Sequence, residues 1–292
     1  MRDWEGTLDA ALRQQWKRYR KALQRCQRHL SEEAVHDSRV EGRRLLSQLE
    51  LLGVLAPARD FKKARVPLKD HLETFDELRD TQVLLLLLEQ QTEAFPETRP
   101  LRQTLRRREK RCLAKAARRI RAVKTGRVKQ FVAALRRQLA SARVSPERRG
   151  RERRVILKAI DRAFAQVVER RNKMDPGNVA TLHRTRVAFK KFRYMVEVLH
   201  RLQPGISAAR IKEMQAFQTL FGNLQDTDVF LGRLDKFASK DRQQALTLAA
   251  FRHFLLQQRT AQIDACLRHA DVILEFWPRR RPAASVRPSK AL

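Results

Sequence analysis

The chain has 292 residues, of which 42% are hydrophobic, so it can form one large helical domain or two smaller ones and is not a disordered polycation. Its 64 Lys and Arg against 32 Asp and Glu give a net charge of +32, which favours a polyanionic partner over a merely solubilising surface. Nucleic acid, polyphosphate and an anionic membrane surface all fit that charge. The longest apolar run covers only residues 83–88, so no membrane span is predicted, and the first residues lack the apolar core of a signal peptide.

Helical periodicity runs through almost the whole chain and is interrupted mainly at prolines, which predicts an all-α fold. Ser31, followed by two glutamates, is expected to cap the second helix. The basic segment 278–292 is expected to be disordered and to add loose affinity for anions. The predicted helices cover residues 7–29, 33–54, 59–77, 80–92, 97–124, 126–142, 148–173, 178–202, 206–222, 225–238 and 240–275.

An internal repeat is the most informative feature of the sequence. Residues 35–52 read VHDSRVEGRRLLSQLELL, and residues 182–199 read LHRTRVAFKKFRYMVEVL. The identical pairs are His36/His183, Arg39/Arg186, Val40/Val187, Glu50/Glu197 and Leu52/Leu199. A second block follows in the same order, LRDTQV at residues 78–83 and LQDTDV at residues 224–229. We therefore predict a tandem duplication, with a junction near residues 141–149 and the two halves packed with pseudo-two-fold symmetry.

The first repeat block places cations along one face of a helix. At about 100° per residue, His36, Arg39 and Arg43 share one face, and leucines lie opposite them. In the second block the polar face holds His183, Arg186, Lys190 and Arg193, and the opposite face holds Phe189, Phe192, Val196 and Leu199. We call these two rows of cationic residues the basic stripes. Arginine forks and mobile lysine charges at such spacing can follow successive phosphates of a polymer.

Two interpretations of the basic stripes stay open at this point. Arg39 and Arg186 can contact a ligand, or they can pair with buried acids such as Asp80 and Asp226, and we expect both to apply. The paired histidines can face the ligand or be ordinary hydrogen-bonded groups. Metal binding is not expected, because the remaining histidines show no paired-ligand spacing.

Other charged and thiol-bearing residues are less specific. Residues 101–137 hold fifteen Lys and Arg with Glu109 as their only acid, so a second anion-facing surface is plausible beside a simple solvated face. Its cations on related turns are Arg107, Arg111, Arg118 and Arg121. The scattered Cys26, Cys112 and Cys266 are expected to be reduced core residues, and the leucines of residues 83–88 are expected in the core.

The two HxxRVxx[KR][KR] blocks, each followed by a Leu-x-Asp-Thr-x-Val block, resemble the CHAD domain, a family of helical domains named for its histidine. The resemblance covers roughly residues 5–275 and implies a single domain of two four-helix units, about 5–142 and 148–275, around a central basic channel or cleft. It implies inorganic polyphosphate as the ligand and association with polyphosphate granules. No cofactor is expected, and the scattered cysteines fit reduced thiols in the cytoplasm.

Transferred onto this sequence, the family's motif implies a set of polyphosphate-binding residues. They are His36, Arg39, Arg43, Arg44, His183, Arg186, Lys190, Lys191 and Arg193, with Lys212 as a further candidate. The first block departs from the motif at Leu46, where the family commonly has a basic residue, so the first half is expected to grip less strongly at that end.

The predicted function is polyphosphate binding without catalysis. The alternative is non-specific binding of nucleic acid, which the scarcity of aromatic residues disfavours. Phosphoryl-transfer chemistry is not expected, because the sequence shows no phosphate-cradling glycine loop, no Walker lysine and no acidic cluster near the basic blocks. A membrane-surface role is not expected either, because the apolar faces are needed for the helical bundle.

Overall fold

The computed structural model describes residues 3–142, 145–200, 206–239 and 241–277. These residues are helical and form no β-sheet, which confirms the all-α prediction. The α-helices are α1 (Trp4–Arg28), α2 (Glu32–Leu52), α3 (Ala58–Glu73), α4 (Asp76–Glu89), α5 (Arg99–Arg121), α6 (Gly126–Ala142), α7 (Pro146–Asn172), α8 (Val179–Leu199), α9 (Ala208–Ala238), α10 (Arg242–Thr247) and α11 (Ala249–Arg268). Short 3-10 helices are η1 (Gly53–Leu55), η2 (Pro96–Thr98) and η3 (Ala270–Glu275). The predicted disordered segment 278–292 lies outside the described residues.

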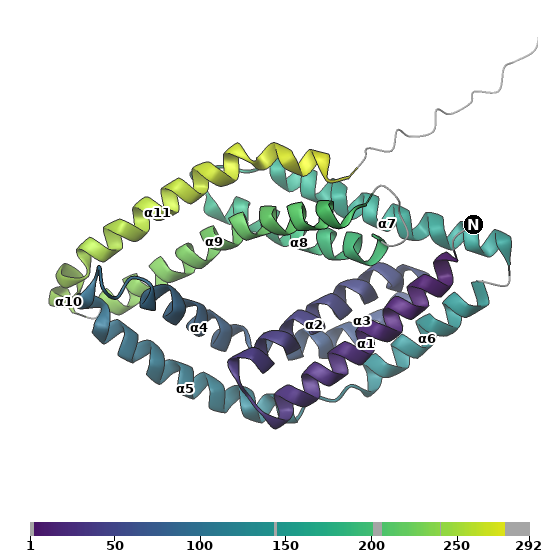
Figure 1. The fold of residues 1–292 in the computed structure, drawn as a ribbon, viewed down its shortest axis with the longest axis horizontal. Helices are drawn as coiled ribbons and strands as arrows, with labels where there is room; N and C mark the ends of the chain where they lie inside the picture. Colours follow the sequence, from purple (N-terminus) through teal and green to yellow (C-terminus); the bar gives the residue numbers. More distant parts are fainter. Residues whose placement is uncertain (1–2, 143–144, 201–205, 240, 278–292) are drawn as a thin grey trace, which may run out of the picture.

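The helices form an elongated molecule in which α2 and α8 face each other across its middle (Figure 1). At one end α1, α2, α3 and α6 pack together, and α7 packs along α8. Toward the other end α4 pairs with α5 and α9 pairs with α11, and these two pairs converge near α10. This arrangement brings the two blocks of the repeat, 147 residues apart in the sequence, into contact.

Three predicted helix boundaries are wrong. The predicted helices 206–222 and 225–238 belong to one continuous helix, α9, because no proline interrupts them and a helix tolerates Gly222 at the expected break. The predicted helix 240–275 is divided into α10, α11 and η3, with the break at the buried Leu248. The break predicted between residues 77 and 80 lies earlier, at Phe75, whose fully buried ring separates α3 from α4.

The helix caps agree with the sequence pattern more closely than these three helix boundaries do. The Ser31 hydroxyl accepts a hydrogen bond from the Ala34 backbone N–H at 3.1 Å, as predicted for the N-cap of α2. Ser207 caps α9 in the same way, through the backbone N–H of Arg210 at 3.1 Å. These caps fix where α2 and α9 begin and therefore fix the register of the polar residues along them.

The apolar stripes opposite the basic ones are buried, as predicted. Leu45, Leu49 and Leu52 of α2 are fully buried, and Phe189 and Phe192 of α8 belong to an aromatic cluster that continues into α7, α9 and the chain beyond η3. Val196 and Leu199 of α8 are also fully buried. Burial of these faces aims the opposite, cationic faces away from the core.

A second, smaller core lies where α4, α5, α9 and α11 meet. Leu84, Leu85 and Leu88 enter it, as predicted for the leucine run, whereas Leu86 is 45% exposed. Its aromatic members are Phe230 and Phe251, whose ring centroids lie 5.6 Å apart. Residues from both predicted halves therefore share one core.

The three cysteines, Cys26, Cys112 and Cys266, are buried free thiols, in agreement with the prediction. Burial raises the pKa of Cys26 to about 11. Among the described helices, none combines the length and apolar character that a bilayer crossing requires.

Candidate anion-binding site

Five cations from the two basic stripes converge where α2 faces α8. Burial, followed by the charge of Arg43 and the charges of three further arginines, lowers the pKa of the half-buried Lys190 to about 7. The three further arginines are Arg186, Arg39 and Arg193. The side chains that sequence reasoning assigned to separate blocks thus lie within one electrostatic field.

Carboxylates from α4 hold the α2 arginines in place. Arg39 is only 6% exposed, and its Nη1 donates to Asp76 Oδ1 at 2.8 Å and to the Leu72 carbonyl oxygen at 3.1 Å. Arg43 Nη2 lies 4.0 Å from the same Asp76 oxygen. The predicted partner Asp80 is close enough to affect the pKa of Arg39, but the hydrogen-bonded partner is Asp76.

The expectation that no acidic cluster lies near the basic blocks is wrong. Loss of hydration and the charge of Asp76 raise the pKa of Asp80, and burial raises the pKa of Asp226 on α9, which Asp80 raises further. Asp80 and Asp226 are the acids expected beside Arg39 and Arg186, whereas Asp76 was not singled out by the sequence pattern. No group of three or more His, Cys, Asp or Glu side chains in the described part of the chain is arranged to hold a metal ion.

Arg186 is the α8 counterpart of Arg39 but is bound differently. It packs across Gly222 of α9, where a Cβ atom would lie 3.9 Å from its Nε and Nη2. Burial lowers its pKa against the opposing charge of Asp226. Its buried Nε–H has no hydrogen-bond partner among the described residues. A buried donor without an acceptor is costly, so this group is suited to an incoming anion oxygen.

The remaining predicted site residues differ in how far they are exposed and free to contact a ligand. His36, His183, Lys191 and Lys212 are exposed. Lys191 Nζ lies 3.5 Å from Glu50 Oε2, so this ion pair joins α8 to α2, and Arg44 Nη1 lies 3.0 Å from Glu41 Oε1. Although His183 is exposed overall, the incomplete hydration of its ring, followed by the charge of Arg186, lowers its pKa.

The side chain of Arg193 is buried and bonded to other residues of the protein. It is 5% exposed, its Nε donates to Gln218 Oε1 at 2.9 Å, and its Nη1 pairs with Glu197. Its guanidinium carbon also lies 4.3 Å from the centroid of the Tyr194 ring. Its donors are thus largely occupied, and it acts on Lys190 through its charge.

Two arginines near the site were not predicted. Arg79 of α4 lowers the pKa of Asp226, and Arg233 of α9 lowers that of Asp80. A signal was available, because Arg79 is adjacent to Asp80 and Arg233 lies two helical turns beyond Asp226. Sequence reasoning also missed His71, a fully buried residue of α3 whose Nδ1 lies 2.9 Å from the Tyr19 hydroxyl and whose Nε2 lies 3.1 Å from Ser38 Oγ.

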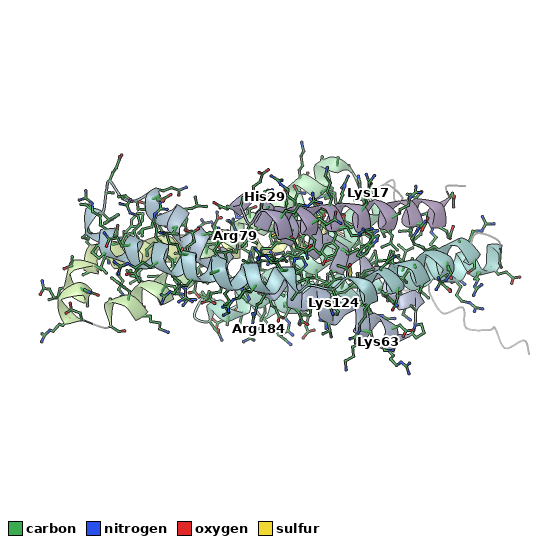
Figure 2. The ribbon with its side chains drawn as sticks, turned by 90° about the horizontal axis from the view of Figure 1, so that it is seen from below. Lys17, His29, Lys63, Arg79, Lys124 and Arg184 are labelled. Carbon is green, nitrogen blue, oxygen red and sulfur yellow. The ribbon has the colours of Figure 1, made fainter. Side chains whose placement is uncertain are left out.

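Positive charge also covers the outside of the molecule. Nitrogen-bearing side chains project along its whole length, among them Lys17, Lys63 and Lys124 (Figure 2). The predicted second surface is exposed on α5. None of the four arginines singled out on its related turns forms an ion pair with a described residue; these are Arg107, Arg111, Arg118 and Arg121. This surface is a solvated face of one helix, whereas the site between α2 and α8 is enclosed by several.

Comparisons with known proteins agree with this architecture. The crystal structure of the CHAD domain from the plant Ricinus communis is similar to this chain, with a TM-score of 0.66 and 21% sequence identity, over 94% of this chain and 92% of that one. No curated protein matches the sequence. The model of the CHAD domain family matches residues 10–235. The chain therefore belongs to the CHAD domain family.

Proposed function

We propose that this protein binds inorganic polyphosphate along the two basic stripes, without chemical conversion of the polymer. The observation that carries the proposal is the convergence of Lys190 with four arginines of α2 and α8, beside an Arg186 Nε–H that lacks a partner among the described residues. So many cations desolvated together are unfavourable without a compensating anion. A chain of phosphates supplies closely spaced negative charge and many acceptor oxygens.

The carboxylates support binding rather than oppose it. Asp76 holds Arg39 and lies close to Arg43, so these arginines are oriented before the ligand arrives. The negative charge of Asp226 favours the charged form of Arg186. Preorganised donors lose less conformational entropy on binding than free arginine side chains would.

A flexible phosphate polymer suits the site better than nucleic acid does. The aromatic rings around α8 pack on one another in the core, so they offer no series of exposed platforms for bases. We propose that the polymer lies in a basic channel between the two repeat-related halves, and that the protein resides in the cytoplasm at polyphosphate granules.

Calorimetric titration with long-chain polyphosphate tests this proposal. Replacement of Lys190 by Met should weaken binding roughly tenfold or more, about the loss of one good charge-assisted contact. The matched control is Lys129→Met, at an exposed lysine of α6, which should bind like the wild type. Displacement of polyphosphate by duplex DNA at equal phosphate concentration would instead favour the nucleic-acid alternative.

A further inference from the structure

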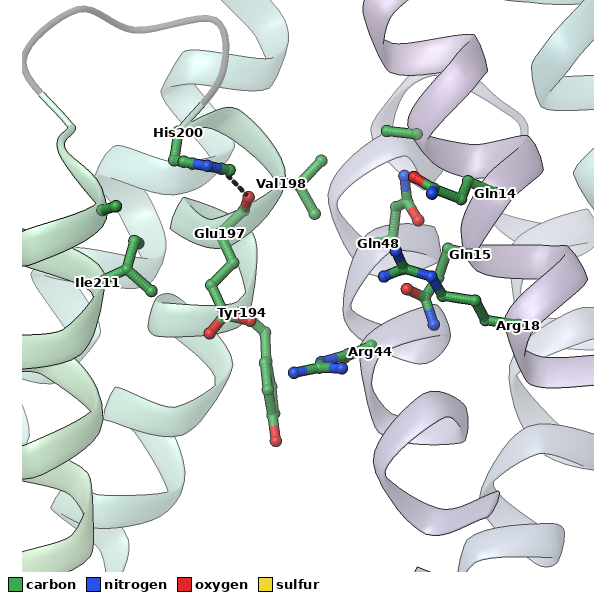
Figure 3. Close-up of a pocket in the computed structure, with 12 residues that line it drawn as sticks. Gln14, Gln15, Arg18, Arg44, Gln48, Tyr194, Glu197, Val198, His200 and Ile211 are labelled. Carbon is green, nitrogen blue, oxygen red and sulfur yellow. Dashed lines mark hydrogen bonds between the residues drawn. The ribbon is translucent and has the colours of Figure 1, made fainter. Parts of the chain in front are cut away.

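A pocket of about 310 Å³ lies between α1 and α2 on one side and α8 and α9 on the other (Figure 3). Its walls carry polar side chains that polyphosphate binding does not require. Gln48 stands with Gln14 and Gln15 on one wall, and Glu197 of α8 lies on the other. The volume is at the lower end of the range for small-molecule sites.

Gln48 is the residue that a folding role does not explain. It is 2% exposed and lines the pocket, yet its amide forms no hydrogen bond with another described residue. The corresponding position of the second block is Met195, which is also buried, so the helix packing does not demand an amide there. The Gln48 amide atoms are reached from the pocket and are not sealed in the core, so a molecule bound in the pocket is positioned to hydrogen-bond with them.

Tyr194 adds a flat surface. It projects from α8 toward Arg44 of α2 (Figure 3), and Arg193 covers its ring from 4.3 Å. Its hydroxyl forms no hydrogen bond within the described residues. A ring supported in this way by a guanidinium can stack an aromatic group on the pocket side.

Cations at the pocket supply a place for phosphate. Arg18 of α1 is exposed and forms no ion pair with a described residue, and Arg44 retains further donors beyond its contact with Glu41. The acidic Glu197 is already neutralised by Arg193. The pocket therefore combines a positive edge, a stacking surface and a free amide.

We propose that this pocket binds a nucleoside monophosphate, with its base against Tyr194 and Gln48 and its phosphate at Arg18 and Arg44. Glutamine amides pair well with the edge of adenine, and the guanidinium fork suits a phosphate dianion. This site goes beyond polyphosphate binding and does not rest on it, because neither Gln48 nor Tyr194 belongs to the basic stripes.

Equilibrium binding of AMP, ribose 5-phosphate and inorganic phosphate to the wild-type protein is the first test. AMP should bind roughly tenfold more tightly than ribose 5-phosphate, because only AMP uses the ring and the amide. Equal affinity of AMP and ribose 5-phosphate would overturn the proposal without any variant being needed.

Gln48→Met, which copies the residue of the second block, is the second test. It should weaken AMP binding roughly tenfold and leave polyphosphate affinity and the melting temperature near those of the wild type. Tyr194→Leu should weaken AMP binding similarly and serves if the first variant does not fold. Wild-type AMP affinity in both variants, or an equal loss of polyphosphate affinity, would contradict a separate nucleotide site.

Discussion

Lys190 on α8 lies in the electrostatic field of Arg43 on α2, and of the four arginine charges that lower its pKa, that of Arg43 acts most strongly. The two residues occupy corresponding positions of the internal repeat and form neither an ion pair nor a hydrogen bond with each other. They are like charges, and burial of the apolar faces of their helices holds them near each other. This repulsion should make the stability of the ligand-free protein and its affinity for a polyanion depend on pH, and both can be measured.

Polyphosphate affinity should fall as the pH rises from 6 to 8. Lys190 has a pKa of about 7, so it is largely protonated at the lower pH, and bound phosphate favours that protonated form. Binding at pH 7.5 should therefore take up protons, which calorimetry in buffers of different ionisation enthalpy detects. Lys190→Arg should flatten the profile, whereas His183→Gln should leave it unchanged, because the pKa of His183 is already lowered. A profile that persists in Lys190→Arg would assign the dependence to another group.

The ligand-free protein should become more stable as the pH rises above 7. The folded-state pKa of Lys190 is about 7 against 10.5 for an unperturbed lysine, so the unfolded chain binds more protons between these values. Urea unfolding in phosphate-free buffer at pH 7 and pH 9 measures the effect. The rise should be smaller in Lys190→Met, and an identical rise in that variant would count against the assignment.

Neutralising two stripe cations should cost far more affinity than neutralising two cations of α5. The matched pair is Arg186→Gln with Lys190→Gln against Arg107→Gln with Arg111→Gln, since each variant replaces two basic side chains by glutamine. We expect a loss of roughly a hundredfold for the stripe variant and severalfold for the α5 variant, because exposed charges are screened by salt. Polyphosphate titrations at two salt concentrations check this, and equal losses would show that the total charge matters more than the site.

His71→Leu should destabilise the fold by about 1–3 kcal/mol, because it leaves the buried hydroxyls of Tyr19 and Ser38 without their partner. Burial, with the charge of Arg39, lowers the pKa of His71 to about 4, so the wild type should also lose stability as the pH falls from about 6.5 to about 4. Urea unfolding at pH 7 and pH 5 tests both expectations. A leucine variant that retains the acid sensitivity would locate its cause elsewhere.

Gly222→Ala should stabilise α9 by about 0.5–1 kcal/mol, because the glycine is helical and a Cβ atom meets Arg186 only at 3.9 Å. Gly222→Leu should instead displace the Arg186 guanidinium and weaken polyphosphate binding. Thermal unfolding and titration of both variants separate these effects. Tight binding by the leucine variant would mean that the position of Arg186 is unimportant.

Local sequence patterns predicted the helical faces well and the tertiary partners poorly. The burial of Leu45 and Phe189 opposite Arg39 and Arg186 follows from helical periodicity, which acts over a few residues. That Arg39 is bonded to Asp76 depends on where α3 ends, and the misplaced boundary near Phe75 hid it. The buried contacts of Arg193 were not visible either, because Gln218 reaches it from another helix.

The smaller core has a consequence for synthesis of the chain. Leu84, Leu85 and Leu88 are made 142 to 167 residues before Phe230 and Phe251, which complete their core. At ribosomal rates of roughly 5–20 residues per second, the leucines of α4 and α5 wait about 7 to 30 seconds for the α9 and α11 side of their shared core. During that interval the nascent chain exposes an apolar helical surface. The yield of folded protein in cells should therefore depend on chaperone supply and on the speed of translation.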